Sequence, residues 1–395
     1  MTQIVGIYDV IILGGGAAGL MAAGRAGQRG RRVLLLERGQ KIGAKILISG
    51  GGRCNFTNLH TAPERFISSN PHFCKSALKN YSQQDFIALV TRHKIPYHEK
   101  TLGQLFCDNS AQAITTMLLE ECRAGSVDIR TGQNIDTINK SGVFSVCTQD
   151  ATYHAPALIL ATGGLSIPKL GATDLSYRLA QKFGLEIIAP RPGLVPFTFA
   201  DETLAMMQAL TGTSLEVVAS CARMRFREAM VFTHHGLSGP AILQASSYWH
   251  ESMPITLDLA PDTDITAYLR DNKNIRPKST LKTTLATLLP QRLALAWVTH
   301  HTDNPIIGTC TDKKLHDIAQ ELQTWTLHPS GTEGYIKAEV TVGGIDTRAL
   351  SSKTMMANAV PGLFIVGEAM DVTGWLGGYN FQWAWSSGWA AGSAV

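Results

Sequence analysis

The chain has 395 residues, of which 45% are hydrophobic and 17% charged, so it can bury the cores of two or three domains and is neither a small module nor a disordered tail. Its formal net charge of +4 neither demonstrates nor excludes a polyanionic partner. Its seven cysteines form no Cys-x-x-Cys pair, which argues against a zinc ribbon, an iron–sulfur cluster and a dithiol redox motif. We therefore expect free thiols and no metal.

The N-terminal apolar run predicts no targeting segment. It is interrupted by Asp9 and reaches Gly14 without the basic start or the cleavage site of a signal peptide. No later stretch has the roughly 18 consecutive apolar residues of a membrane span. The sequence therefore predicts a cytoplasmic protein that does not cross a membrane.

A strand, a glycine turn and a helix open the chain. Residues 8–13 predict a buried strand, and Gly14-Gly15-Gly16-Ala17-Ala18-Gly19 leads into a helix. In such a motif Gly14 makes the tight turn, Gly16 lets a pyrophosphate approach the backbone, and Gly19 permits close helix–strand packing. The phosphates would lie at the helix N-terminus.

The second predicted strand, residues 33–36, supports the same interpretation. It ends in Glu37, 18 residues after Gly19, where an acid can bind the hydroxyl groups of an adenosine ribose. The two elements together predict binding of an adenine dinucleotide.

Two later strands indicate which dinucleotide this is. Residues 158–160 lead into Ala161-Thr162-Gly163-Gly164, and residues 363–366 lead into Gly367-Glu368, with Asp371 shortly after. Flavoproteins built from two dinucleotide domains have such strands beside FAD. Gly377-Gly378-Tyr379-Asn380 then opens an apolar helix, whose N-terminus would stabilise negative charge on a reduced flavin. We therefore expect FAD. Because no second Gly-x-Gly-x-x-Gly occurs, NADH or NADPH would dock only transiently as electron donor.

Several segments resemble a known family. Lys41 to Asn58, with Lys45 and Ser49-Gly50-Gly51-Gly52-Arg53-Cys54-Asn55, resembles the signature of the BaiN/RdsA family of NAD(P)/FAD-dependent oxidoreductases. Residues 232–240 and 338–344 resemble it as well. Residues 70–78, 98–108 and 374–389 are similar to the RdsA branch, whose members are ribosomal RNA dihydrouridine synthases.

The resemblance implies an α/β fold. It comprises a Rossmann-like FAD-binding domain formed by residues 1–190 and 341–395, an inserted β-rich domain formed by residues 191–263 and 329–340, and a helical insertion at residues 264–328. The motifs and the resemblance together place FAD against Gly14, Gly16, Ala17, Ala18, Gly19, Glu37, Arg38, Lys45, Ser49, Gly51, Gly52, Arg53, Cys54, Asn55, Ala161, Thr162, Gly163, Gly164, Gly367, Glu368, Asp371, Gly378, Tyr379 and Asn380.

The branch implies reduction of the C5=C6 bond of a uridine in large-subunit ribosomal RNA or in an assembly intermediate. Hydride reaches C6, and C5 then needs a proton from a positioned acid. Cys107 lies in the branch-specific stretch and Cys54 in the glycine loop, so both are candidate donors, with Cys107 preferred. The alternative acids are His98, His234 and Tyr379.

Two other functions remain open: reduction of a small-molecule enone such as a steroid or bile acid, and flavin-dependent binding without catalysis. All three share the FAD motifs. Residues 266–330 contain eight Lys and Arg against five Asp and Glu. This excess permits contact with RNA but also fits a solvated helix face.

Overall fold

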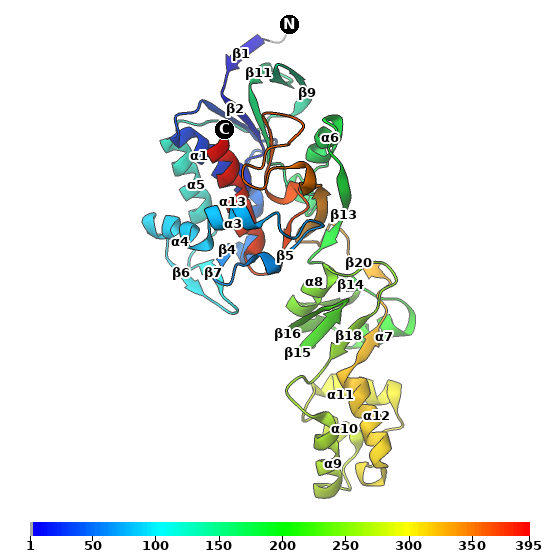
Figure 1. The fold of residues 1–395 in the computed structure, drawn as a ribbon. Helices are drawn as coiled ribbons and strands as arrows, with labels where there is room; N and C mark the ends of the chain where they lie inside the picture. The colour runs from blue at the N-terminus through cyan, green and yellow to red at the C-terminus, as the bar shows by residue number, and fades with distance from the viewer. Residues whose placement is uncertain (1–2) are drawn as a thin grey trace. The chain divides into compact units, whose positions relative to one another are not determined.

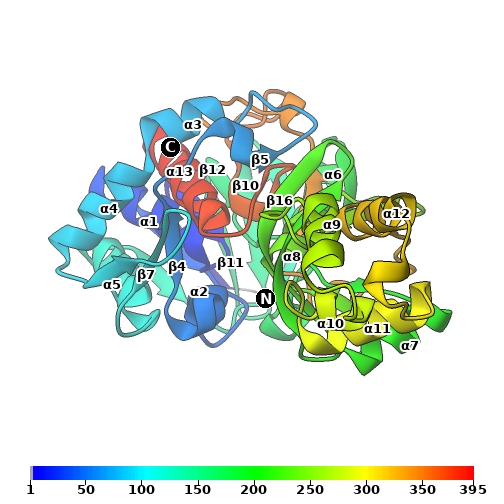
Figure 2. The ribbon, with the colours of Figure 1, turned by 90° about the horizontal axis from the view of Figure 1, so that it is seen from below.

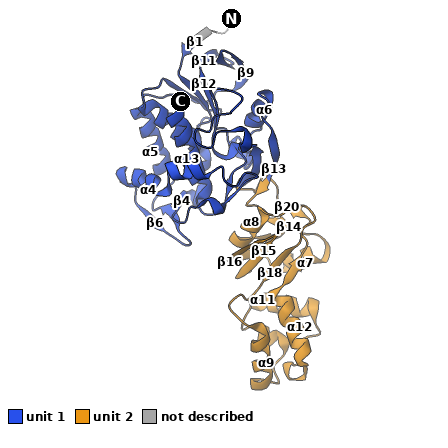
Figure 3. Cartoon of the chain, in the orientation of Figure 1, with its two compact units in different colours: residues 1–191, 340–395 blue, residues 192–339 orange. Residues whose placement is uncertain are grey.

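The computed structural model describes residues 3–395. It divides the chain into two compact units, Met1–Arg191 with Val340–Val395, and Pro192–Glu339 (Figure 3). The predicted α/β class is confirmed by a parallel sheet in the first unit, with further antiparallel sheets in both units (Figure 1).

A five-stranded parallel sheet forms the centre of the first unit. Its order is β22-β12-β2-β3-β8, and its strands are β2 (Val10–Leu13), β3 (Val33–Leu36), β8 (Asp128–Arg130), β12 (Ala157–Leu160) and β22 (Leu363–Ile365). The two glycine-motif strands are four apolar residues each and are buried throughout, as expected for a parallel sheet covered on both faces. The loops that follow all five strands therefore leave the sheet at one edge.

Helices and a second sheet cover this core. Helices α1 (Ala17–Gln28) and α13 (Tyr379–Ala394) lie side by side, and α1 also packs against α5 (Gln112–Ala124) (Figures 1 and 2). An added Cβ at Gly388 would lie 2.5 Å from the carbonyl oxygen of Ala18, and one at Gly392 would lie 2.5 Å from that of Ala22. Small residues thus let the two helices approach closely. The sheet β1-β11-β10-β9 consists of β1 (Gln3–Ile7), β9 (Ile135–Ser141), β10 (Val143–Thr148) and β11 (Ala151–Ala155).

The first unit also contains a small antiparallel sheet with the order β4-β7-β6. Its strands are β4 (Asn55–Asn58), β6 (Tyr97–Glu99) and β7 (Gln104–Cys107). The remaining elements of the unit are α2 (Ala44–Ile48), β5 (Phe66–Ile67), α3 (Lys75–Asn80), α4 (Gln83–Arg92), α6 (Leu175–Lys182), β13 (Ile187–Gly193), β21 (Val340–Ile345) and β23 (Thr373–Gly374).

The second unit contains a seven-stranded antiparallel sheet with the order β19-β18-β15-β16-β17-β14-β20. Its strands are β14 (Phe197–Thr198), β15 (Ser214–Cys221), β16 (Met224–Phe232), β17 (Gly236–Ser238), β18 (Ile255–Asp258), β19 (Trp325–Leu327) and β20 (Gly331–Thr332). Its helices are α7 (Asp201–Ala209), α8 (Pro240–Ser246), α9 (Ile265–Ile275), α10 (Leu281–Leu285), α11 (Gln291–His301) and α12 (Asp312–Gln323). The helical pattern from residue 264 ends earlier than predicted, because Trp325 and Leu327 are buried on either side of exposed Thr326 and join the sheet.

Candidate functional site

The glycine turn between β2 and α1 has one crowded and one open glycine. An added Cβ at Gly19 would lie 1.9 Å from the carbonyl oxygen of Gly14, so only glycine permits this helix–turn approach. An added Cβ at Gly16 would meet no described atom within 4 Å. Gly16 is also the N-cap of α1, where Ala17 and Ala18 begin the helix. The turn therefore presents open space in front of a helix N-terminus, the arrangement that receives phosphates.

Glu37 holds this turn in place. Its Oε2 accepts a hydrogen bond from the Gly15 amide at 2.7 Å, and its Oε1 accepts one from the Gly39 amide at 2.6 Å. The carboxylate is half-buried, and Arg38 beside it is exposed. Each carboxylate oxygen can accept a further hydrogen bond. Glu37 can therefore bind a ribose while it orders the turn.

The loop after β12 lies beside this turn. The Ala161 amide donates to the carbonyl oxygen of Leu13 at 2.8 Å, which continues the pairing of β12 with β2. Gly163 has a positive φ of 76°, and an added Cβ there would meet no described atom within 4 Å. The hydroxyl groups of Thr162 and Ser176 lie 2.6 Å apart. Gly163 thus provides a second open backbone position at the same edge of the sheet.

The loop from Ser49 to Asn55 also bends through positive φ values. Gly51 and Gly52 have φ values of 66° and 84°, and an added Cβ at Gly51 would meet no described atom within 4 Å. The Cys54 amide donates to the carbonyl oxygen of Ser49 at 3.0 Å, which closes the loop. Arg53 is exposed. The exposed backbone here suits a flat or anionic ligand.

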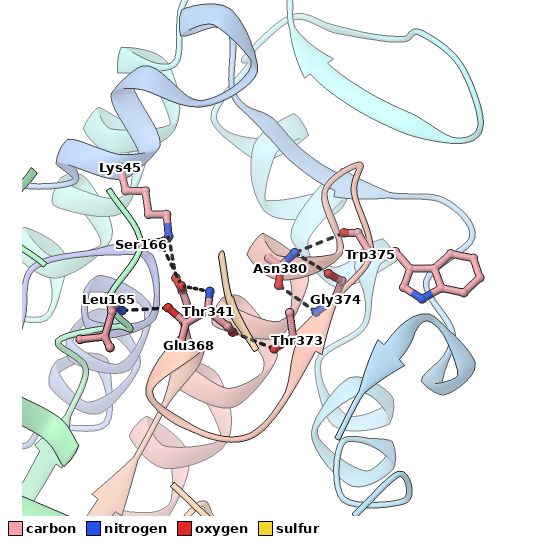
Figure 4. A network of polar contacts seen from close by, with 9 residues as sticks. All are labelled: Lys45, Leu165, Ser166, Thr341, Glu368, Thr373, Gly374, Trp375 and Asn380. Carbon is pink, nitrogen blue, oxygen red and sulfur yellow. Dashed lines mark hydrogen bonds and ion pairs between the residues drawn. The ribbon is translucent and has the colours of Figure 1, made fainter. Parts of the chain in front are cut away.

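Lys45 in α2 and Glu368 after β22 form a salt bridge that connects these two segments (Figure 4). The Lys45 Nζ lies 2.6 Å from Glu368 Oε2 and donates to Ser166 Oγ at 2.7 Å. Glu368 Oε1 accepts hydrogen bonds from Ser166 Oγ at 2.9 Å and from the Thr341 amide at 2.8 Å. Gly367, just before Glu368, donates its amide to Ser387 of α13 at 3.0 Å. This network fixes the loops after β12 and β22 relative to the start of α2.

Asn380 orders the chain at the start of α13. Its amide group accepts from the Gly374 amide at 2.8 Å and donates to the carbonyl oxygens of Gly374 at 2.8 Å and Trp375 at 3.2 Å (Figure 4). Gly378, with φ 96°, is the N-cap. The neighbouring Tyr379 is buried against the Phe66 ring, with the ring centroids 6.2 Å apart.

The helices α1 and α13 run in the same direction. Gly388 packs on Ala18, and four residues later Gly392 packs on Ala22. Since α13 begins nine residues before Gly388 and α1 only one before Ala18, the N-terminus of α13 projects about 12 Å beyond that of α1. The structure thus has two positive helix ends separated along one direction.

Asp371 is buried in the segment between β22 and α13. Its Oδ2 accepts hydrogen bonds from the Ser69 amide at 2.8 Å and from Ser69 Oγ at 2.6 Å. This carboxylate therefore connects the segment before α13 with the segment after β5.

The two candidate thiols lie on the core side of the sheet β4-β7-β6. Cys54 and Cys107 are 0% and 1% exposed, and the Cys107 amide donates to the carbonyl oxygen of Arg53 at 3.0 Å. Burial raises the pKa of Cys54 to about 12 and that of Cys107 to about 11. Both thiols are therefore protonated at neutral pH and have little access to solvent.

His98 lies on the other face of that sheet. It pairs with Phe106 across β6 and β7, and successive residues of a strand point to opposite faces, so Cys107 points away from both. His98 Nδ1 lies 2.6 Å from Asp108 Oδ1, and its ring stacks on Phe106 with the centroids 6.3 Å apart. The side chain of His98 is 43% exposed. Of these three candidate acids, only His98 is open to a substrate.

The other two candidate acids are not part of this sheet. Tyr379 is buried at the start of α13. His234 is an exposed residue between β16 and β17 in the second unit, and its carbonyl oxygen accepts a hydrogen bond from Gln208 at 3.2 Å.

Ser166 and Thr341 are parts of the site that sequence reasoning missed. Neither belongs to a glycine motif, although Thr341 lies within the family-like segment 338–344 and Ser166 two residues after Gly164. The described residues contain no group of three or more His, Cys, Asp or Glu side chains that could hold a metal ion. Across residues 3–395, no helix is long and apolar enough to cross a membrane.

Comparison with protein families matches residues 8–394 to the HI0933-like protein Rossmann domain. The chain belongs to this family. Curated proteins from Escherichia coli K12 and Haemophilus influenzae, both named ribosomal RNA dihydrouridine synthase, are 48% and 45% identical to it, and the alignments cover 97% and 98% of this chain and 96% and 98% of theirs.

Two further matches are more distant. A 3-dehydro-bile acid delta(4,6)-reductase from Clostridium scindens is 29% identical over 97% of this chain and 98% of its own length. The solved structure of a 3-ketosteroid-delta4-(5alpha)-dehydrogenase from Rhodococcus jostii RHA1 is similar with a TM-score of 0.51 and 15% identity, covering 99% of this chain and 98% of that one. The latter likeness shows a shared fold.

Proposed function

We propose that this protein is an FAD-dependent reductase that converts a uridine of ribosomal RNA to dihydrouridine, with NADH or NADPH as the source of hydride. The observation that carries the proposal is the 48% identity, over nearly the full length of both chains, to a protein named ribosomal RNA dihydrouridine synthase. The proposed substrate is a large-subunit RNA or its assembly intermediate, and the proposed location of the activity is the cytoplasm.

The residues present fit FAD. The open position at Gly16 and the N-terminus of α1 would hold the pyrophosphate, and Glu37 the adenosine ribose. The open backbone at Gly51 and Gly163 would lie along the ribityl chain and the ring system. Gly378 and the N-terminus of α13 would face the pyrimidine end of the flavin. The remaining proposed contacts come from Arg38, Ser49, Gly52, Arg53, Asn55, Ala161, Thr162, Gly164, Gly367 and Asp371.

Lys45, Glu368 and Asn380 act by keeping these loops in place. Glu368 accepts from Lys45, Ser166 and the Thr341 amide, so its charge is compensated within the loop cluster. Asn380 uses its amide on backbone groups of residues 374 and 375. The loops are thus ordered by the protein itself, and little ordering entropy is left to oppose FAD binding.

The protein must then supply a proton at C5 of the uracil. Bound FAD supplies the hydride for C6, and every other requirement falls on side chains of this chain. His98 is exposed, and Asp108 holds its ring through Nδ1, which leaves Nε2 available to carry the proton to a substrate. Cys107 and Cys54 could donate only if β7 or the glycine loop moved. The geometry therefore favours His98 over the thiols that the sequence prefers.

Reduction of a small-molecule enone is the second candidate. It is supported by the 29% identity to the bile-acid reductase, a smaller likeness than those to the two RNA-modifying proteins. The deciding experiment incubates the purified FAD-loaded protein and NADPH or NADH with ribosomal RNA from a strain that lacks this gene, or with a 3-keto-Δ4 steroid. Dihydrouridine in the RNA supports the proposal, and oxidation of the nicotinamide by the steroid alone contradicts it.

A further inference from the structure

The outer face of the sheet β4-β7-β6 carries a pair of side-chain amides, of which Gln104 has no role in the proposed FAD site. Gln104 in β7 lies two residues before Phe106 on the same face, and Asn55 in β4 is paired in register with Phe106. The side-chain amides of Asn55 and Gln104 are 3.1 Å apart. Both residues are half-buried.

The two glycines before α13 pack against this pair. An added Cβ at Gly377 would lie 3.0 Å from Gln104 Cδ, and one at Gly378 would lie 2.9 Å from the side-chain amide of Asn55. On the same face, an added Cβ at Gly50 would lie 2.8 Å from the Phe106 ring. Both loops proposed to contact the flavin ring therefore border the face on which Gln104 lies. A base stacked on that ring would present its edge here.

The orientation of the Gln104 amide follows from that of Asn55. The Asn55 nitrogen fits beside the carbonyl oxygens of Thr57 at 3.2 Å and Leu105 at 3.3 Å, which turns Asn55 Oδ1 toward the Gln104 amide at 3.1 Å. Gln104 must therefore turn its nitrogen toward Asn55. One N–H of Gln104 is used in this way, and among residues 3–395 its side chain forms no hydrogen bond besides the one with Asn55.

We propose that Gln104 is a specificity-determining residue that binds the uracil edge, donating to O4 and accepting from N3–H. A primary amide carries a donor and an acceptor side by side, and amide side chains recognise bases in this paired manner. Cytosine has the reverse pattern at these positions, with a donor at N4 and an acceptor at N3. Asn55 fixes the positions of the nitrogen and the oxygen of the Gln104 side-chain amide. The fixed amide therefore favours uracil over cytosine.

The position of His98 agrees with this assignment. His98 is opposite Phe106, so it is the diagonal neighbour of Gln104 on the same face, about 7–8 Å away. In a uracil held by Gln104 at N3 and O4, C5 is the next ring atom after C4. The two side chains thus lie at the separation needed to hold one edge of the ring and to protonate its neighbour.

The inference rests on the proposed function. One complementation experiment distinguishes failure of the inference from failure of the proposed function. Wild-type protein, Gln104→Leu and Gln104→Glu are expressed in a strain that lacks the gene, and dihydrouridine in its ribosomal RNA is quantified by mass spectrometry. Gln112→Glu is the matched control, because Gln112 is exposed on α5. Each purified variant is also measured for FAD content and for the rate of flavin reduction by NADPH or NADH.

We expect both Gln104 variants to form dihydrouridine about 10-fold to 100-fold more slowly, with FAD content and flavin reduction unchanged and Gln112→Glu equal to wild type. On transcribed RNA with 4-thiouridine in place of uridine, wild type should slow while Gln104→Leu slows no further, since the lost contact is the same. Full activity of Gln104→Leu, loss of FAD from it, or additive effects would overturn the inference. Wild type that forms no dihydrouridine would instead refute the proposed function.

Discussion

The ammonium group of Lys45, at the start of α2, lies 2.6 Å from the carboxylate of Glu368, which follows β22 near the other end of the chain. Sequence reasoning assigns both residues to FAD. In the structure they bind each other, and Glu368 also accepts from Ser166 and from the Thr341 amide. Their main effect is therefore to hold the loops of the proposed FAD site together.

Lys45→Met should destabilise the FAD-free protein modestly. A charged hydrogen bond contributes about 1.5–3 kcal/mol, but the Lys45 side chain is 37% exposed, so solvent screening reduces the effect to about 1 kcal/mol. The expected fall in Tm is roughly 2–4 °C, measured by differential scanning fluorimetry. Lys41→Met, at an exposed lysine four residues earlier, is the control and should leave Tm unchanged. Equal shifts for both variants would contradict the role of the network.

Gly16→Ala and Gly19→Ala should fail in different ways. A methyl group at Gly16 meets no described atom, so the FAD-free protein should keep its Tm, while FAD binding should weaken by about 1–3 kcal/mol because the pyrophosphate loses its close approach. A methyl group at Gly19 meets the carbonyl oxygen of Gly14 at 1.9 Å, so the fold itself should lose about 3 kcal/mol or more. Thermal denaturation with and without FAD separates the two. Unchanged FAD affinity in Gly16→Ala would refute the phosphate position.

Replacement of each candidate acid should identify the proton donor. His98→Gln should slow uridine reduction by about 10²-fold or more, with FAD content and nicotinamide-driven flavin reduction intact. Cys107→Ala should keep catalysis, because its thiol lies on the core side of the sheet, and should instead lower Tm. Cys54→Ala should lower FAD occupancy. Rapid-mixing measurements separate flavin reduction from uridine reduction.

Asp108→Asn supplies the matched control for His98. It replaces the carboxylate that holds His98 Nδ1 by an amide of the same size, so uridine reduction should slow less than in His98→Gln, with FAD content and flavin reduction unchanged. Cys107→Ala that loses uridine reduction with normal stability and FAD content would establish the thiol as donor and exclude His98.

Burial of the thiols should determine which cysteines are alkylated and how stable the protein is at alkaline pH. Cys147 is half-buried, and hydrogen bonds from Thr152 and Thr137 lower its pKa, so it should react first with iodoacetamide at pH 8. Cys54 and Cys107 should react only on unfolding. Their pKa values are raised from 9.0 to about 12 and about 11, so the unfolded chain loses these protons first, and the free energy of unfolding should fall as the pH rises above 9. Peptide mass spectrometry identifies the alkylated cysteines, and denaturation at pH 8 and pH 10 measures the change in the free energy of unfolding. Early labelling of Cys107 would contradict its burial.

The parallel core could be predicted because short-range patterns determine it. The run Val10–Leu13 is apolar and is followed by glycines at fixed spacing, and Val33–Leu36 is followed by an acid. Each feature is local, and parallel strands bring the loops to one edge without further information. Gly19 is crowded against the Gly14 carbonyl oxygen, as close packing requires, while the phosphate role of Gly16 stays a prediction.

The side-chain partners within the site could not be predicted in this way. Cys107 and His98 occur in one branch-like segment, and only the register of β7 with β6 shows that they point to opposite faces. The Thr341 amide donates to the side-chain carboxylate of Glu368, which belongs to a distant segment. Such contacts depend on tertiary packing, which no spacing along the chain encodes.

The central claim is tested most directly by nucleoside mass spectrometry of ribosomal RNA from a strain in which this gene is deleted. The account predicts that dihydrouridine is lost from that RNA, and that it returns when the gene is supplied in its wild-type form but not as Gly16→Ala expressed at the same level. Dihydrouridine at the wild-type amount in the deletion strain would contradict it and would favour reduction of a small-molecule enone.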